Sequence, residues 1–278
     1  MPDKLICLQQ TLSLSVSDLL FKYITVRREN MTKKKYKCII TVQWASCSQN
    51  ATELLTVIKN IVQTATHLNE QRDILLFVNI TDDIYAIASE TEIISEIMNL
   101  CPEYIITSSI NSGTDIPTYF MMLNYLSKHQ ISSDYILKLH TKNDATCIKQ
   151  MTNCFMNGKL EKAISVMDAI PSIDILGGKD LVMPNYHVHD ILRPLFTVNG
   201  DASKYQQMQF VAGSAFLSRF QTQLTILTKY PELIKQALLL CQYVNGWFFQ
   251  SNSPAHALER IIGGFESVAN GKSVKAWI

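Results

Sequence analysis

The sequence predicts an α/β fold in which a mostly parallel β-sheet is flanked by helices and followed by an irregular C-terminal half. The first observation is alternation: between residues 38 and 139, apolar β-branched runs of strand length alternate four times with stretches of helical periodicity. The second is the shortness of the connections, which is typical of sheets built from strand–helix–strand units. The third is size, because 278 residues that are 47% hydrophobic can bury a substantial core.

Buried strands and amphipathic helices account for the first half of the chain. The run ILLFVNI has the nearly unbroken apolar character of a strand that is covered on both faces. The stretch that follows the first strand carries Leu54, Ile58 and Ile61 at helical spacing. We expect strands over residues 38–44, 74–80, 104–107 and 135–139, and helices over residues 50–67, 90–100 and 115–129.

The second half alternates less regularly. Pro231 is expected to break a helical pattern, and Ser253 followed by Pro254 forms a recognisable helix start, since serine caps helices and proline suits their first turn. A long loop is expected over residues 183–203. We expect helices over residues 147–168, 221–243 and 253–263, and strands over residues 173–176 and 210–216.

The N-terminal segment differs in composition from the rest. A helix near residues 17–23 would lead into a run of lysines and arginines, so we interpret residues 1–37 as a basic arm or helix. We expect residues 38–278 to form a single domain. Its first half, residues 38–145, contains the regular alternation, and its second half, residues 146–278, contains the less regular part.

Composition and charge exclude several classes of protein. The net charge is +1 and charged residues make up 18%, whereas dedicated nucleic-acid binders carry a strong basic excess. No apolar run approaches the ~20 residues that a membrane span requires. The seven cysteines form no CxxC pair, which favours buried free thiols in a reducing compartment, and the N-terminus does not read as a secretory signal. We therefore expect a cytoplasmic protein with no nucleic-acid partner and no membrane span.

Polar and ionisable residues follow three successive predicted strands. Asp82 and Asp83 come after the second strand, residues 111–115 after the third and residues 140–144 after the fourth. The carboxyl ends of parallel strands meet at one edge of a sheet, where such folds bind their ligands. Polar loops are common in α/β proteins, but three in succession predict a binding site at this edge.

Four short segments, taken in order, resemble the motifs of one known family. They are NSGTDIPTYF at 111–120, YILKLHTKND at 135–144, FVAGSAFLSR at 210–219 and PAHALER at 254–260. Together they resemble the rhamnan synthesis protein F family over about residues 38–265. The resemblance implies a GT-A-like, Rossmann-related fold and the transfer of a sugar, often L-rhamnose, from a nucleoside diphosphate carrier. Residues 38–145 would then bind the nucleotide-sugar and residues 146–278 the acceptor.

On this resemblance the donor binds at the strand ends. Asp82 and Asp83 would accept hydrogen bonds from the base or the ribose, although a plain turn or a helix cap is an equally simple interpretation. Asn111, Gly113 and Asp115 would contact the sugar or nucleotide, with Gly113 allowing a close backbone approach. Asp115 could instead serve only as a cap for the helix that follows.

The fourth strand departs from the GT-A pattern. Where those enzymes place an Asp-x-Asp motif that holds a metal, this chain has His140, Thr141 and Lys142. Lys142 could neutralise the diphosphate without a metal, which we favour. Alternatively, His140 and Asp144 could bind Mn²⁺ or Mg²⁺, or His140 could be a strand-end histidine bonded to the backbone.

The last motif supplies the candidates for catalysis. Glu259 and His256 are three residues apart and share one helix face. The resemblance makes Glu259 the general base that deprotonates the acceptor hydroxyl, with His256 orienting it or contacting phosphate. The alternative is a structural Glu259 that pairs with Arg260 or Arg219. An acidic residue that the family often has before this helix is replaced here by Asn252-Ser253.

The acceptor would lie against the small residues Gly213 and Ser214 and could stack on Trp247, although an aromatic residue is more often part of a core. The leading hypothesis is therefore an inverting glycosyltransferase in polysaccharide biosynthesis, which uses a UDP- or dTDP-linked sugar and a glycan acceptor. The alternative is a catalytically inactive nucleotide-sugar or glycan-binding module with the same fold. A dehydrogenase or methyltransferase is disfavoured, since no GxGxxG turn follows the first predicted strand.

Overall fold

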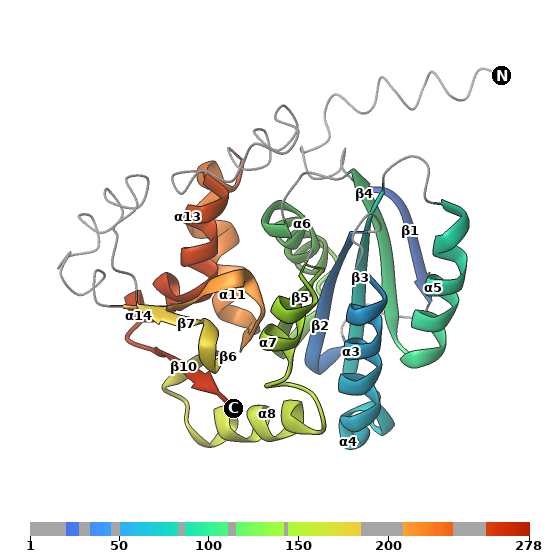
Figure 1. Cartoon of the computed structure of the whole chain (residues 1–278). Coiled ribbons are helices and arrows are strands. Elements are labelled where there is room, and N and C mark those ends of the chain that lie inside the picture. The colour runs from blue at the N-terminus through green and yellow to red at the C-terminus, as the bar shows by residue number, and fades with distance from the viewer. Residues whose placement is uncertain are drawn as a thin grey trace.

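The computed structural model describes residues 21–27, 34–45, 51–82, 87–110, 115–141, 144–184, 208–235 and 254–278. Within these residues an eight-stranded sheet has the strand order β1-β4-β3-β2-β5-β9-β6-β10, and helices pack against it (Figure 1). Its strands are β1 (Phe21–Arg27), β2 (Lys35–Ala45), β3 (Ile74–Asp82), β4 (Tyr104–Ile110), β5 (Ser132–His140), β6 (Ile173–Gly178), β9 (Phe216–Arg219) and β10 (Ser273–Trp277). A separate two-stranded sheet pairs β7 (Val182–Pro184) with β8 (Gln209–Val211).

The centre of the main sheet is parallel. Strands β4, β3, β2 and β5 lie side by side in the same direction, with Cys38 of β2 beside Ile74 of β3 and Tyr135 of β5. Strand β9 runs antiparallel between β5 and β6, and β1 pairs antiparallel with the outer side of β4. The prediction of a mostly parallel sheet is confirmed. The carboxyl ends of β2 to β5 meet at one edge, which we call the carboxyl edge.

Helices cover both faces of the sheet, as predicted. One face packs against α3 (Ala51–Thr64), α4 (Thr66–Glu70), α5 (Ile87–Leu100), α7 (Ala145–Thr152) and α8 (Lys159–Ala169). The other packs against α6 (Asp115–Lys128), α11 (Phe220–Lys229) and α13 (Pro254–Arg260). Each face has its own apolar core, because successive side chains of a strand point to opposite sides. In β2, Val42 and Trp44 belong to the α3 side, and Ile39 to the α6 side.

The predicted helix over residues 147–168 is wrong in one respect, because two helices occupy this stretch. Residues 153–158 form turns between α7 and α8, and both Asn157 and Gly158 have positive φ, which a continuous right-handed helix excludes. The turn is held by α3: Asn157 N–H donates to Asn60 Oδ1 at 2.8 Å and Gly158 N–H donates to Thr64 Oγ1 at 2.9 Å.

The predicted strand over residues 210–216 is also wrong as a single element. A 3₁₀ turn, η3 (Ala212–Ser214), separates β8 in the small sheet from β9 in the main sheet. Gly213 has φ of 76° within it, so the chain turns sharply rather than continuing extended. The break near Pro231 is confirmed, since α11 ends at Lys229 and helical residues resume at 231–235.

The two ends of the described chain add strands that the sequence did not predict. The helix expected near residues 17–23 is wrong at residues 21–23, which begin strand β1, while residues 17–20 lie outside the described part. Part of the expected basic arm over residues 1–37 therefore belongs to the sheet. Strand β10 extends the opposite side beside β6. Helix α13 begins at Pro254 as predicted and continues into a π-helical turn over Ile261–Phe265.

No helix in the described part of the chain has both the length and the apolar character needed to cross a bilayer.

Candidate functional site

A row of polar side chains crosses four adjacent strands at the carboxyl edge. In the strand register, Thr107 of β4 lies beside Asn79 of β3, Asn79 beside Gln43 of β2, and Gln43 beside His140 of β5. We call these four residues the polar row. All are buried, on the side of the sheet that α6 covers. Toward the amino ends of these strands the same face is mainly apolar, with Ile39, Phe77, Ile105 and Ile136, so the polar side chains concentrate toward the carboxyl end.

The polar row is tied to its neighbours by hydrogen bonds. Thr107 Oγ1 donates to Asn79 Oδ1 at 2.8 Å, and Asn79 Nδ2 donates to Ser109 Oγ at 2.8 Å. Thr81, beside Ser109, donates from Oγ1 to the carbonyl of Trp44 at 3.0 Å. Burying polar groups is costly unless they are hydrogen-bonded, so these contacts offset the burial of Asn79 and Thr107.

A buried ion pair lies next to the row. Lys138, two residues before His140 on the same side of β5, pairs with the carboxylate of Asp115 in the first turn of α6. The side chain of Lys138 is only 2% exposed and that of Asp115 is 14% exposed. The ammonium group also lies 5.3 Å from the ring centre of Tyr119, within the range of a cation–π contact. Burial raises the pKa of Tyr119 well above its ordinary value, so its hydroxyl stays neutral.

His140 connects the ion pair to the second half of the chain. Its Nε2 lies 3.8 Å from Asp115 Oδ2 and 2.6 Å from the carbonyl oxygen of Gly213. Its Nδ1 lies 3.0 Å from the carbonyl oxygen of Thr141. Carbonyl oxygens only accept hydrogen bonds, so both contacts are satisfied when both ring nitrogens carry hydrogen.

Glu259 completes the chain of contacts from the C-terminal helix. Its Oε1 accepts a hydrogen bond from the N–H of Gly213 at 2.8 Å. Asp115, His140, Gly213 and Glu259 are thus joined through successive contacts, and with Lys138 we call them the carboxyl-edge cluster. The cluster brings together α6, β5, the η3 turn and α13, which are far apart in the sequence.

The backbone conformation at position 213 explains why a glycine occupies it. Gly213 adopts φ of 76°, a left-handed conformation that glycine enters without the strain of a side chain. In this conformation its carbonyl meets His140 while its N–H meets Glu259. Gly213 was predicted to contact the acceptor sugar and His140 the donor sugar. The backbone of Gly213 connects His140 with the predicted base Glu259.

The charged group beside the Glu259 carboxylate is the guanidinium of Arg260. Burial lowers the pKa of the Arg260 guanidinium, and the neighbouring Glu259 carboxylate opposes that shift. The guanidinium carbon lies 5.2 Å from the ring centre of Phe210 in β8. Arg219, the other expected partner of Glu259, instead donates to the carbonyls of Met167 and Ile173.

The predicted metal ligands do not form a metal site in the described residues. Asp144 caps α7: its Oδ1 accepts from the N–H of Thr146 at 2.8 Å, a bond that lowers the pKa of Asp144. Both ring nitrogens of His140 face carbonyl oxygens. Nowhere in the described part do three or more His, Cys, Asp or Glu side chains gather as a metal would need. The residues that would carry Mn²⁺ or Mg²⁺ thus do not fit that role, and we assign no step to a metal.

Other predicted site residues cannot be placed with their side chains. Asp82 ends β3 beside Ile110, and His256 lies within α13 three residues before Glu259, but only their backbones are described. The same holds for Ser214 in the η3 turn. Outside the described residues lie Asp83, Asn111, Gly113, Lys142 and Trp247.

The sequence reasoning missed Lys138 and three members of the polar row, Gln43, Asn79 and Thr107. Each stands within or at the end of an apolar run that we interpreted only as a buried strand. The alternation of strand side chains between the two faces could have identified them. Gln43 and Asn79 are separated by even numbers of residues from apolar residues of the same strands that pack toward α6. A polar residue inside a buried strand is a signal in its own right, since it needs a partner.

A scan against protein-family models finds no match for this chain, and a search among curated proteins finds no similar sequence. The resemblance to the rhamnan synthesis protein F family therefore rests on the four sequence segments alone.

Proposed function

We propose that the chain is an inverting glycosyltransferase with a GT-A-like fold. It would move a sugar, with L-rhamnose as the first candidate, from a UDP- or dTDP-linked donor to a hydroxyl of a glycan acceptor. The observation that carries the proposal is the convergence of Asp115, His140 and Glu259 on the carboxyl edge. These residues come from three of the four sequence segments on which the resemblance rests.

The position of the cluster also supports the proposal. Ligands of parallel α/β sheets bind outside the carboxyl ends of the strands, which is where the polar row and the cluster lie. The polar row is buried and bonded internally, so a ligand would instead meet the partly buried Glu259, whose carboxylate can accept hydrogen bonds from sugar hydroxyls.

Glu259 would act as the general base. Its Oε1 is fixed by the N–H of Gly213, and within the described residues no second hydrogen bond engages the carboxylate. The carboxylate would take the proton of the acceptor hydroxyl while that oxygen attacks the anomeric carbon and the bond to the diphosphate breaks. In this scheme Lys142 and the His140 ring would balance the charge of the departing diphosphate. Lys138 is less suited to this role because Asp115 already neutralises it.

The test is a donor assay with a matched pair of variants. Purified full-length protein is incubated with a panel of UDP- and dTDP-linked sugars, with and without Mn²⁺, and nucleoside diphosphate release is measured. Glu259→Gln keeps an acceptor oxygen for Gly213 but removes the base, so turnover should fall by about 10²-fold or more with little change in donor affinity. Glu232→Gln alters an exposed glutamate and should leave turnover unchanged. Failure of every donor to bind or react would reject the proposal.

A second candidate is a nucleotide-sugar or glycan-binding module without catalysis. The observation that favours it is the internal engagement of the cluster: Asp115 is paired with Lys138, and both His140 ring nitrogens face backbone carbonyls. Saturable donor binding by calorimetry, with no diphosphate release in the presence of any acceptor extract, would select this candidate. Turnover that Glu259→Gln abolishes would exclude it.

A further inference from the structure

A hollow lies at the opposite edge of the sheet from the carboxyl-edge cluster. It has a volume of about 490 Å³ and opens beside Lys35 and Ser132, the first residues of β2 and β5. His140, in the cluster, is the last residue of β5. A strand rises about 3.3 Å per residue, so the two sites are separated by roughly 25 Å along β5. The hollow is therefore distinct from the site of the proposed transferase reaction.

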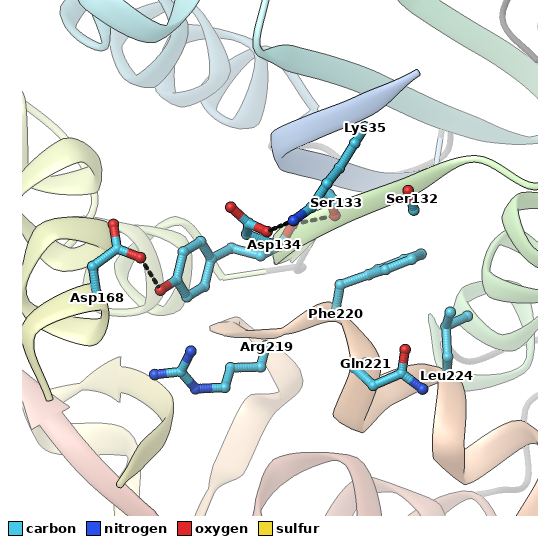
Figure 2. Close-up of a pocket in the computed structure, with 10 residues that line it drawn as sticks. Lys35, Ser132, Ser133, Asp134, Asp168, Arg219, Phe220, Gln221 and Leu224 are labelled. Carbon is cyan, nitrogen blue, oxygen red and sulfur yellow. Dashed lines mark hydrogen bonds and ion pairs between the residues drawn. The ribbon is translucent and has the colours of Figure 1, made fainter. Parts of the chain in front are cut away.

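Two walls of different character form this hollow (Figure 2). One wall consists of the starts of β2 and β5, with Lys35 and Asp134 joined by an ion pair of 2.5 Å. The facing wall is the start of α11, where the partly exposed Leu224 provides apolar surface, Phe220 lines the hollow but is almost fully buried, and Gln221 provides an amide. At one end lie Arg219 and Asp168, and the Tyr135 hydroxyl donates to Asp168. A ligand here would meet charged groups on one side and apolar carbon on the other.

The acidic side chains of the hollow are already occupied by donors. Asp168 accepts from the Tyr135 hydroxyl at 2.7 Å and pairs with Lys37 at 2.9 Å. Asp134 pairs with Lys35 at 2.5 Å and with Lys37 at 3.3 Å. Burial alone would raise the pKa of Asp168, but the hydrogen bonds from Tyr135 and Lys37 outweigh it and lower the pKa. The carboxylate thus stays charged and paired.

The basic and amide groups retain donors that no described contact uses. The ammonium of Lys35 has three N–H groups and one described partner, Asp134, while its side chain is 65% exposed. Arg219 has five N–H groups, of which two donate to the carbonyls of Met167 and Ile173. The side-chain amide of Gln221 is exposed at the mouth. The hydrogen-bonding groups of the hollow that remain unused are mainly N–H donors, and those of Lys35 and Arg219 are cationic.

We propose that this hollow binds a small organic anion, with its phosphate or carboxylate group held by Lys35 and Arg219 and its carbon body against Phe220 and Leu224. Among the residues that line the hollow, the charges of Lys35 and Arg219 balance those of Asp134 and Asp168, so it is the unused N–H groups of the two cations, and not a net charge, that favour an anion. Arg219 suits a planar or tetrahedral oxyanion because its N–H groups diverge as a fork. The volume falls within the roughly 300–1,000 Å³ of known small-molecule sites.

The experiment titrates the full-length protein with four probes by isothermal calorimetry and by NMR. Phenyl phosphate carries an anion and an apolar ring, benzoate replaces phosphate by carboxylate, inorganic phosphate lacks the ring, and phenol lacks the charge. Phenyl phosphate or benzoate should bind saturably, and the tighter of the two identifies the anion. Inorganic phosphate should bind at least about tenfold more weakly, since it loses the apolar contact, and phenol should show no saturable binding.

Lys35→Gln should weaken binding of the anionic probe by about tenfold, the usual scale for one charge-assisted hydrogen bond. The matched control is Lys149→Gln, because Lys149 is similarly exposed and also paired with a carboxylate, that of Glu53. Asp134→Asn removes the competing acceptor of Lys35 and should bind at least as tightly as the unaltered protein. Absence of saturable binding, or binding that Lys35→Gln leaves intact, would overturn the proposal without touching that of the transferase.

Discussion

The ammonium group of Lys138 pairs with the carboxylate of Asp115, so that strand β5 is joined to the first turn of α6 by a buried ion pair. Neither charge can easily be reached by water. Removing one partner of such a pair leaves the other charge desolvated and uncompensated, whereas removing both is far less costly. The pair therefore contributes to the geometry of the carboxyl edge even though it would not be expected to stabilise the fold more than an apolar pair.

The first prediction follows from this pair. Lys138→Met should lower the free energy of unfolding by about 3–5 kcal/mol, because Asp115 remains buried without its partner. The double variant Lys138→Met/Asp115→Leu should recover a large part of that loss. Urea denaturation of both variants measures the coupling. As a control, Lys149→Met at the exposed pair with Glu53 should cost less than about 1 kcal/mol; strict additivity of the two buried changes would contradict this account.

The second prediction concerns two glycines that differ in their surroundings and in their backbone conformation. A methyl group on Gly264 would lie 2.5 Å from the carbonyl oxygen of Gln209, so Gly264→Ala must displace the backbone of β8. We expect a loss of about 3 kcal/mol, as for an overpacked core. Gly271 has φ of 69° with nothing within 4 Å, so Gly271→Ala should cost only about 1 kcal/mol of backbone strain. Equal losses of unfolding free energy in urea denaturation would contradict this prediction, because they would show that the backbone of β8 moves aside at little cost.

The third prediction concerns thiol reactivity. Burial raises the pKa of Cys38 and Cys154 to about 12 and that of Cys101 to about 11, so these thiols stay protonated and inaccessible. Cys147 is partly exposed. In folded protein at about pH 8, iodoacetamide should modify Cys147 and leave the other three intact, as read by mass spectrometry of peptides. All four should react after unfolding in guanidinium chloride, and early modification of Cys38 in folded protein would refute the assignment.

The fourth prediction is a pH dependence. The folded protein holds the pKa of Asp168 below its ordinary value through hydrogen bonds that outweigh the effect of burial. A lowered carboxyl pKa means that this contribution to stability is present above about pH 4 and is lost as the pH falls through the folded pKa. Asp168→Asn should therefore destabilise the protein at neutral pH, by less than about 1 kcal/mol for so exposed a pair, and the difference should vanish in acid.

Thermal unfolding between about pH 2.5 and pH 7 would measure that dependence. Asp180→Asn, at an exposed residue of the same type, is the control and should show no such pH-dependent difference. A constant difference between Asp168→Asn and the unaltered protein at every pH would show that the carboxylate charge is not the cause.

The central sheet could be predicted because its signal is local. Runs such as residues 74–80 are apolar and β-branched over a full strand length, and their alternation with helices restricts the connection to a parallel sheet. The four predicted strands of the first half all exist; each is longer than predicted, and β3 and β4 begin at the expected residues, 74 and 104.

The errors arose where pairing is distant or where a turn signal was overlooked. Strand β1 pairs with β4, about eighty residues away, so nothing near Phe21–Arg27 reveals its partner. Its β-branched residues, Ile24, Thr25 and Val26, were nevertheless a local hint of a strand. The split between α7 and α8 could have been read from Asn157-Gly158, since Asn-Gly is a typical turn dipeptide.

The candidate site was predicted in part. Asp115 and His140 could be named because they stand at the ends of predicted elements, and Glu259 because of the resemblance of its helix to a family motif. Their connection through the backbone of Gly213 could not be named, since a left-handed turn that offers both its N–H and its carbonyl is a tertiary feature. The burial of Lys138 depends in the same way on where α6 lies.

The two faces of the sheet divide the demands on this sequence between them. Toward α3 the strands are apolar up to Trp44, Ile80 and Leu139, whereas toward α6 the same strands become polar at Asn79 and His140. Substitutions on the α6 face can therefore change the polar groups of the sheet while the opposite layer maintains the architecture. Under the proposed function, this would let specificity vary separately from stability, which would suit the scaffold to directed evolution.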